Sequence, residues 1–452
     1  MKAPTRQLPM KKFPNAFVIM LGVIFLSWGL TFILPQGRYG RVTDPDTGQT
    51  RVVGNSYQEV DGETMGVFDL FLSVPEGLIN QADLIALILL VGGSFYLVEK
   101  TGALGQGLQR IVDLVKGREA VALVMVSLLF ATAGATIGLQ EEIIAMAPIL
   151  ILFCRSMGYN AFVAVACSFG SAVLGAAFSP MNPFAVVLAQ KEAELPLMSG
   201  ALFRLLFLVL AWLIWTGYLI RYARKNRVAP EPMGSGAQKL SGRNILVLFF
   251  LVLTFTGVTY GLVALDWGMN EISASFFALA ILTGVLSGMG IDRAALTYVE
   301  GMKEMTFAAL IMGLASSVPL LLEKGMILDT LIYGLFTPME GLPETLSALG
   351  MLVSQALLHF PVSSYSGQVV LTMPVLTPLA DLVGVSRQVC VLAYQYGAVN
   401  MDLIVPTNGA LMGILAVAGI SFNRWVQFIW KPLLLLLGLG ATAIVVGVST
   451  GF

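Results

Sequence analysis

Apolar runs separated by short polar segments extend along the whole chain, and some of them are short or interrupted. Two such stretches, 120–133 and 143–153, flank a polar turn. Each is shorter than the roughly 20 residues that a membrane-spanning helix needs. They therefore predict a re-entrant hairpin over 119–157. The next apolar helix, 160–190, is interrupted by SPMNP at 179–183, because proline breaks the regular helical hydrogen bonding.

The same arrangement returns in the second half of the chain. The pattern predicts a second hairpin over 344–383 and a second broken helix over 386–418. Counting the spans between them puts the two copies in opposite orientations across the membrane. Such inverted repeats with discontinuous helices indicate a secondary transporter whose binding site lies near mid-membrane. Four landmarks repeat 226 positions later: Pro148, Gly158, Pro180 and Asn182 return as Pro374, Gly384, Pro406 and Asn408.

On this pattern the chain is an all-α polytopic membrane protein with nine full spans and two hairpins. An N-terminal span and a polar extracytoplasmic loop occupy 1–81, and the first repeat occupies 82–222. A cytoplasmic loop, two linking spans and a charged arm (291–305) fill 223–305. The second repeat and a last span complete the chain over 306–452.

Composition supports a membrane protein. Of the 452 residues, 57% are hydrophobic and 12% are charged, against about 25% charged in soluble domains. The basic N-terminus and the basic segment 221–243 are expected in the cytoplasm, because Lys and Arg near a span resist translocation. The first apolar run predicts a retained span rather than a cleaved signal peptide. No basic block of the kind that binds nucleic acid is present.

Polar side chains gather at the two hairpin tips and the two helix breaks, where backbone groups are free to hold a ligand. A carboxylate at mid-membrane costs at least about 2.5 kcal/mol and is by default functional, although it can also cap a helix. The lone His359 is interpreted as a hydrogen-bonded structural residue. The candidate binding residues are Gly138, Glu141, Glu142, Ser179, Asn182, Ser363, Ser364, Ser366, Gln368, Asp402, Thr407 and Asn408.

The charges of this set indicate the ligand. It contains acidic residues and no Arg or Lys, and opposite charge lowers the cost of burying an ion. The set therefore favours a small solute with a cationic group, such as a basic amino acid, carried by exchange or by ion coupling. A carboxylate neutralised by Na⁺ stays open, as does Na⁺ near Asn182 and Asn408, or H⁺, as the coupling ion. No other cofactor and no metal site is expected.

Several motifs resemble the YfcC-type carriers of the DcuC (C4-dicarboxylate anaerobic carrier) family, in the ion transporter superfamily. The resemblance covers nearly the whole chain. It departs from relatives in having Ser316 after Gly-Leu-Ala, and in the sequence GAVNMD at 397–402. The motifs are LPQGRY (34–39), TIGLQEE (136–142), EGMKEM (300–305), VSSYSGQ (362–368), LTMPVLTP (371–378), LAYQYG (392–397) and VPTN (405–408).

This resemblance implies a bacterial inner-membrane secondary carrier. It further implies a homodimer in which a scaffold holds a mobile transport domain that works as an elevator. Members are described as carriers of dicarboxylates or as exchangers of basic amino acids, so a C4-dicarboxylate carrier is the first alternative. A channel is the alternative of a different class. No enzyme is expected, because no catalytic motif is present. The resemblance implies that Glu141, Glu142, Ser363, Ser364, Ser366, Pro406, Thr407 and Asn408 line the site.

Overall fold

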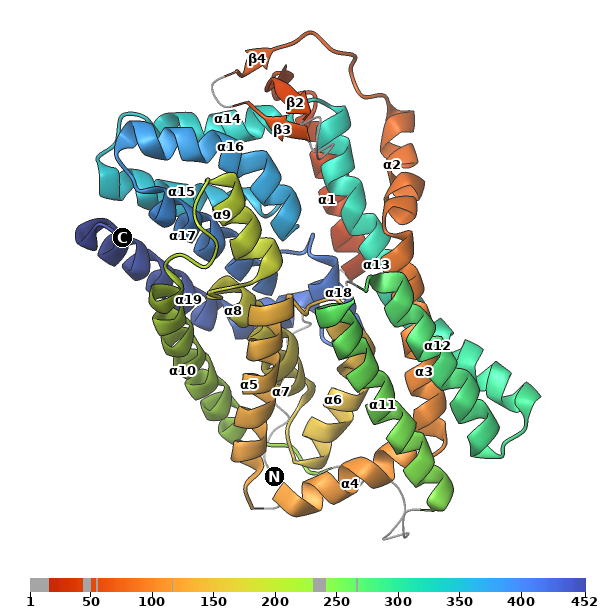
Figure 1. Cartoon of the computed structure of the whole chain (residues 1–452). Coiled ribbons are helices and arrows are strands. Elements are labelled where there is room, and N and C mark those ends of the chain that lie inside the picture. Colours follow the sequence, from red (N-terminus) through yellow and green to blue (C-terminus); the bar gives the residue numbers. More distant parts are fainter. Residues whose placement is uncertain (1–15, 44–49, 54–55, 116, 231–240, 266) are drawn as a thin grey trace, which may run out of the picture.

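The computed structural model describes residues 16–452, with gaps at 44–49, 54–55, 116, 231–240 and 266. The chain is mostly helical (Figure 1). Within the described part, seven helices are long and apolar enough to cross a membrane, and five shorter apolar helices accompany them. A multi-pass membrane protein, as the sequence predicts, is therefore confirmed.

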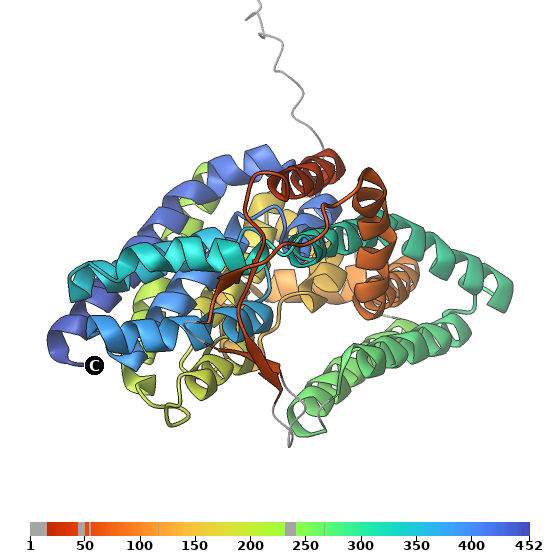
Figure 2. The same cartoon turned by 90° about the horizontal axis from the view of Figure 1, so that it is seen from above.

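One group of helices is organised around the long helix α13, which packs against α2 and α3. Helix α12 packs against α3 and α11, at one edge of the molecule (Figure 2). Polar side chains join these helices: Ser94 of α3 donates to the Phe276 carbonyl of α12 at 2.7 Å, and Tyr298 of α13 donates to the Leu90 carbonyl of α3 at 3.1 Å. The bounds of this group are α1 Ala16–Leu30, α2 Val67–Asn80, α3 Ala82–Lys100, α11 Gly242–Ala264, α12 Met269–Ser287 and α13 Ile291–Lys324.

The second group holds two helix pairs, α5–α6 and α15–α16, and the interrupted helix that follows each pair. In its first half, α5 packs on α8, and the interrupted helix follows α6. Helix α10, the last helix of this half, packs against α19. The bounds are α5 Glu119–Ile137, α6 Glu142–Ser156, α7 Ala161–Val165, a π-helix Ala166–Gly170, α8 Ser171–Ala177, a π-helix Pro183–Val187, α9 Leu188–Glu192 and α10 Ala201–Lys225.

In the second half of this group, α15 packs on α17 and α17 packs on α19. Helix α18 contacts α13, so it joins the two groups. Helix α4 (Ala103–Val115) lies across the end of the molecule opposite the strands (Figure 1). The bounds are α14 Leu328–Phe336, a 3₁₀-helix Thr337–Met339, α15 Glu344–Leu358, α16 Tyr365–Val383, α17 Arg387–Ala398, a 3₁₀-helix Val399–Leu403, α18 Gly409–Val417 and α19 Phe422–Thr450.

An asparagine starts the helix that follows each break. The Asn182 side-chain oxygen accepts from the Phe184 and Ala185 amides at 3.0 and 2.8 Å. The Asn408 oxygen accepts from the Leu411 amide at 2.7 Å. A side-chain acceptor at a helix start satisfies an amide that has no partner within the helix. The breaks are therefore built into the local sequence at the positions that the repeat predicts.

Three sequence expectations are corrected. The chain is not all-α, because two antiparallel ribbons pair β1 (Gly37–Arg38) with β4 (Gln58–Glu59) and β2 (Arg41–Thr43) with β3 (Thr50–Val52). The end of the expected polar loop forms α2, whose Ser73 and Gly77 are buried.

The charged arm expected over 291–305 is the first part of α13, not a separate linker. Its Arg293 and Glu300 are exposed, whereas Ala294, Gly301 and Met305 are buried, so one continuous helix accommodates both patterns. Helices α5 and α16 are also longer than expected, with 19 residues each.

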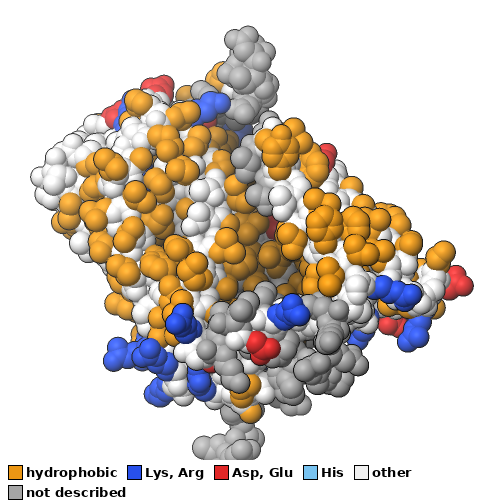
Figure 3. All heavy atoms as spheres, turned by 60° about the horizontal axis from the view of Figure 1, so that its bottom comes forward, with side chains coloured by type: hydrophobic (Ala, Val, Ile, Leu, Met, Phe, Trp, Pro, Cys, Tyr) orange, Lys and Arg blue, Asp and Glu red, His pale blue; other side chains and the backbone are white. Residues whose placement is uncertain are grey.

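Lysine and arginine side chains gather at the end of the molecule where α4 and the last turn of α10 lie (Figure 3). That last turn carries Arg224 and Lys225. The sides of the molecule are covered by apolar side chains (Figure 3). This distribution suits a protein whose sides face lipid and whose ends face water. The basic residues expected at the N-terminus, among them Lys2 and Arg6, lie outside the described residues.

Candidate functional site

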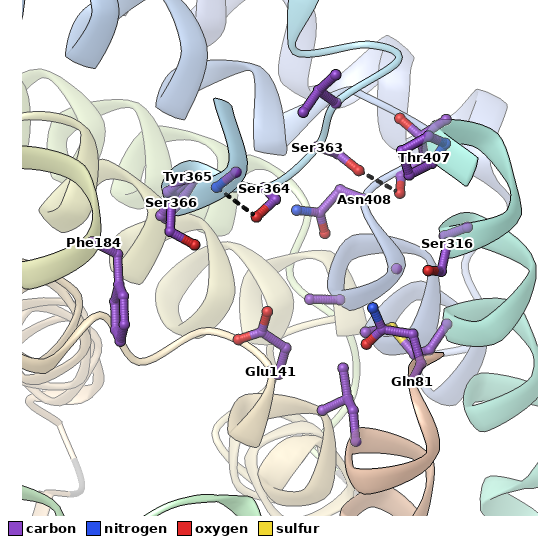
Figure 4. Close-up of a pocket in the computed structure, with 18 of the residues that line it drawn as sticks. Gln81, Glu141, Phe184, Ser316, Ser363, Ser364, Tyr365, Ser366, Thr407 and Asn408 are labelled. Atoms are coloured by element: carbon purple, nitrogen blue, oxygen red, sulfur yellow. Dashed lines mark hydrogen bonds between the residues drawn. The ribbon is translucent and has the colours of Figure 1, made fainter. Parts of the chain in front are cut away.

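A cavity of about 820 Å³ lies between the two helix groups. The α13 residues Met312, Ser316 and Pro319 line it on one side, and the tips of both helix pairs line it on the other. Arg38 and Arg41 of the strands also line it. Figure 4 shows Glu141 pointing into this space, with Ser364 and Asn408 across from it and Gln81 and Ser316 at one side.

The first tip is the turn between α5 and α6. Gly138 ends α5 with φ 70°, a left-handed conformation that favours glycine because a Cβ is disfavoured there. Glu141 and Glu142 then begin α6, where the partial positive charge of a helix N-terminus stabilises carboxylates. The Glu142 carboxylate accepts a hydrogen bond from the backbone amide of Gln140 at 3.2 Å. Glu141 also lines the cavity, and its carboxylate points into that space (Figure 4).

The second tip is the start of α16. The Ser364 oxygen accepts from the Gly367 amide at 3.3 Å, and Ser363 donates to the Thr407 carbonyl at 2.8 Å. Thr407 in turn donates to the Phe360 carbonyl. The first amides of a helix have no intrahelical partner, and Tyr365 and Ser366, which provide them here, line the cavity. The second tip therefore presents donors to the cavity.

A buried polar network is centred on Asp402, next to Gln140 and Asn408 of the cavity lining. Asp402, in the second break, accepts from the Gln140 side chain at 2.7 Å and from the Asn408 side chain at 2.6 Å. Its other neighbour is the His359 ring, with Nε2 at 2.7 Å from Oδ1. The His359 Nδ1 lies 2.6 Å from the Gln368 oxygen. Asp402, His359 and Gln368 are all 0% exposed.

The first break faces away from the cavity. Ser179 donates to the Ala135 carbonyl at 2.6 Å, and Asn182 donates to the Gly134 carbonyl at 2.7 Å. Both side chains therefore fasten the interrupted helix to α5. In this region only Phe184 lines the cavity. Because the Asn182 side-chain oxygen and nitrogen are both hydrogen-bonded, this side chain has a structural role here.

The cavity thus brings together eight of the twelve residues selected from the sequence: Gly138, Glu141, Glu142, Ser363, Ser364, Ser366, Thr407 and Asn408. Gln368 and Asp402 lie in the buried network, and Ser179 and Asn182 lie at the first break. Sequence reasoning did not select Arg38, Gln81 and Ser316, which also line the cavity. It interpreted His359 as a hydrogen-bonded structural residue, and the ring is buried with partners at both nitrogens. A histidine within an apolar segment is a signal in its own right, because ionisable groups are costly there. Arg38, by contrast, joins Glu141 in the cavity lining only through the fold.

Membrane-spanning helices in two groups, with a cavity between the groups lined by both polar and apolar side chains, suit a membrane transporter. The chain belongs to the DcuC family of C4-dicarboxylate anaerobic carriers, whose model matches residues 13–449. This confirms the resemblance noted in the sequence.

Two relatives match over almost their full length. An uncharacterized protein of Haemophilus influenzae is 32% identical over 97% of this chain and 97% of its own. The putative basic amino acid antiporter YfcC of Escherichia coli is 30% identical over 98% of this chain and 97% of its own.

Among solved structures, the chain is similar to the YdaH transporter of Alcanivorax borkumensis, with a TM-score of 0.44 and 16% identity over 97% of this chain and 99% of that one. It is also similar to the Neisseria gonorrhoeae antimetabolite efflux pump MtrF, with a TM-score of 0.42 and 14% identity over 96% and 95%.

Proposed function

We propose that this protein is a secondary carrier that exchanges basic amino acids across the membrane. The observation that carries the proposal is the pairing of charges in one cavity. The Glu141 carboxylate faces the space on one side, and the N-terminus of α16 faces it on the other (Figure 4). A carboxylate binds an ammonium or guanidinium group, and a helix N-terminus binds a carboxylate. An amino acid with a cationic side chain has both groups.

The size of the cavity supports this class of solute. At about 820 Å³ it lies within the range of small-molecule sites, which runs from about 300 to 1,000 Å³. Ser364 and Ser366 add hydroxyl groups that can hydrogen-bond the solute. The name of the E. coli relative, a putative basic amino acid antiporter, agrees with this chemistry.

The transport cycle that we propose moves the second helix group against the first. The cavity lies between the groups, so a displacement of the tips relative to α13 changes the side on which the cavity opens. We assign the basic end at α4 to the cytoplasm, by the positive-inside rule. On that assignment the strands are extracytoplasmic and the cavity, which their Arg38 and Arg41 line, is in an outward-facing state. A bacterial inner-membrane homodimer and an inverted-repeat elevator belong to the same proposal.

Counterflow in proteoliposomes tests the substrate. Vesicles loaded with unlabelled arginine should accumulate labelled arginine and lysine. Excess succinate should not compete. Agmatine, which lacks the carboxylate of arginine, should compete weakly, because it has nothing to place at the α16 N-terminus. Succinate uptake without arginine uptake contradicts the proposal.

The second candidate is a C4-dicarboxylate carrier, which the family name favours. One observation supports it: Arg38 and Arg41 line the cavity. Arg41, however, is paired with Asp329 at 2.9 Å. Among the described residues that line the cavity, Arg38 is then the one basic side chain without such a partner. Glu141 and Glu142 repel a dianion in this cavity. Competition by succinate in the same assay decides between the two.

A further inference from the structure

The His359–Asp402 pair contains a proton whose position can be derived from its neighbours. The Gln368 amide nitrogen donates to the Gln355 carbonyl at 2.9 Å, and a backbone carbonyl can only accept. The Gln368 oxygen therefore faces His359 Nδ1, which must carry a hydrogen.

The other side of the ring faces Asp402. Asn408 is oriented by the Leu411 amide, so its nitrogen donates to Asp402 Oδ1. Gln140 donates to Asp402 Oδ2. A carboxylate that accepts from several donors is stabilised in its charged form. The hydrogen between the ring and Oδ1 therefore belongs to His359 Nε2, and the pair is an imidazolium next to a carboxylate.

Loss of the hydrogen between His359 and Asp402 is energetically costly in this buried position. Without it, two lone pairs face each other at 2.7 Å, and a carboxylate is left buried without a counter-charge. Other titratable groups face the pair from three elements. Glu141 comes from the first tip, Tyr365 comes from α16 and stacks on the His359 ring, and Tyr394 comes from α17. The described residues facing the pair include no Lys or Arg to compensate the charge.

We propose that the His359–Asp402 pair is the site of a transported proton, and that a cationic solute bound at Glu141 displaces it. The network connects the two positions, because Gln140 and Asn408 both line the cavity and both donate to Asp402. The arriving cation supplies the positive charge that the pair loses when its proton leaves. The carrier then exchanges a proton for a basic amino acid. This inference rests on the proposed function for the solute, but the proton site itself does not depend on it.

The chain has one histidine, so ¹⁵N-histidine labelling gives a single ring to observe. The full chain, purified with a tag free of histidine and placed in nanodiscs, is titrated from about pH 5 to about pH 9, which brackets the usual range of histidine titration. We expect both ring nitrogens to be protonated at the acidic end and one to be protonated at the basic end. A ring with one hydrogen throughout, or with two throughout, overturns the proton site.

A pH dye then measures coupling in lightly buffered detergent solution. Saturating arginine should release about one proton per wild-type molecule, by linkage between the two ligands. Asp402→Asn and His359→Gln should release none, whereas Asp381→Asn, an exposed carboxylate on the same helix pair, should behave as wild type. Arginine binding by wild type without proton release overturns the coupling. Absence of arginine binding overturns the proposed solute instead, and the histidine titration still decides the proton site.

Discussion

Gly175 of α8 lies so close to Ala131 of α5 that a Cβ on the glycine would be 2.0 Å from the Ala131 carbonyl oxygen. About one turn away the roles of the two helices are exchanged: a Cβ on Gly134 of α5 would be 2.0 Å from the Ala172 carbonyl oxygen of α8. Small residues at such crossings allow helix backbones to approach closely in membranes. This crossing holds the interrupted helix against the first tip, and so it positions Glu141.

Gly175→Ala should therefore destabilise the protein. A helical alanine is by itself better than glycine by about 1 kcal/mol, but here the methyl group must push α5 away. Overpacking of this kind costs about 1–3 kcal/mol. We expect a lower thermal unfolding temperature in detergent, and reduced uptake in the folded fraction because the tip is displaced.

Gly217→Ala in α10 is the matched control, since a Cβ there meets no atom within 4 Å. It should leave the unfolding temperature unchanged or raise it. Equal losses in both variants would show that the α5–α8 crossing has no special role.

Arg204 of α10 is fully buried, and it orients a side chain that supports the first break. Its Nε donates to the Gln395 oxygen at 3.2 Å, and the Gln395 nitrogen donates to the Ser179 carbonyl at 2.8 Å. Arg204→Met should leave the Gln395 and Gln388 oxygens without donors. Each unsatisfied buried group costs about 1–3 kcal/mol. The unfolding temperature should fall clearly, whereas Arg224→Met at the exposed end of α10 should change it little.

Glu141→Gln should raise the KM for arginine by about tenfold or more. A charged hydrogen bond contributes about 1.5–3 kcal/mol, and each 1.4 kcal/mol is about a factor of ten in affinity. Glu141→Asp should recover part of the loss. Glu300→Gln, an exposed carboxylate on α13, is the control and should transport normally. Unchanged arginine uptake by Glu141→Gln would remove this residue from the site.

Arg41 and Asp329 join the strands to α14. The guanidinium contacts both carboxylate oxygens, at 3.0 and 2.9 Å, and Asp329 also accepts from the Tyr39 amide at 2.9 Å. Because Asp329 is 3% exposed, Arg41→Gln leaves a buried carboxylate, at a cost of about 1–2 kcal/mol after allowing for the partly exposed arginine. We expect faster proteolysis within 37–59. Arg38→Gln loses no such partner among the residues that the structure describes, and it should resist proteolysis as wild type does.

The sequence by itself determined where the helices are interrupted. Proline at 180 and 406, asparagine at 182 and 408, and glycine at 138 act through their own backbone, so the turns and breaks follow from local chemistry. The 226-residue repeat then indicated that these features belong together. Most of the cavity lining, including Glu141, Ser364 and Asn408, could be selected on that basis.

Only the tertiary structure decided which polar residues face the solute and which face one another. Ser179 has its partner, Ala135, 44 residues away, and His359 has Asp402 43 residues away. No local pattern encodes such pairs, because burial and orientation depend on which surfaces of distant helices meet. For the same reason, only the structure shows that Asn182 holds the interrupted helix against α5, and that His359 is the partner of the buried Asp402 carboxylate.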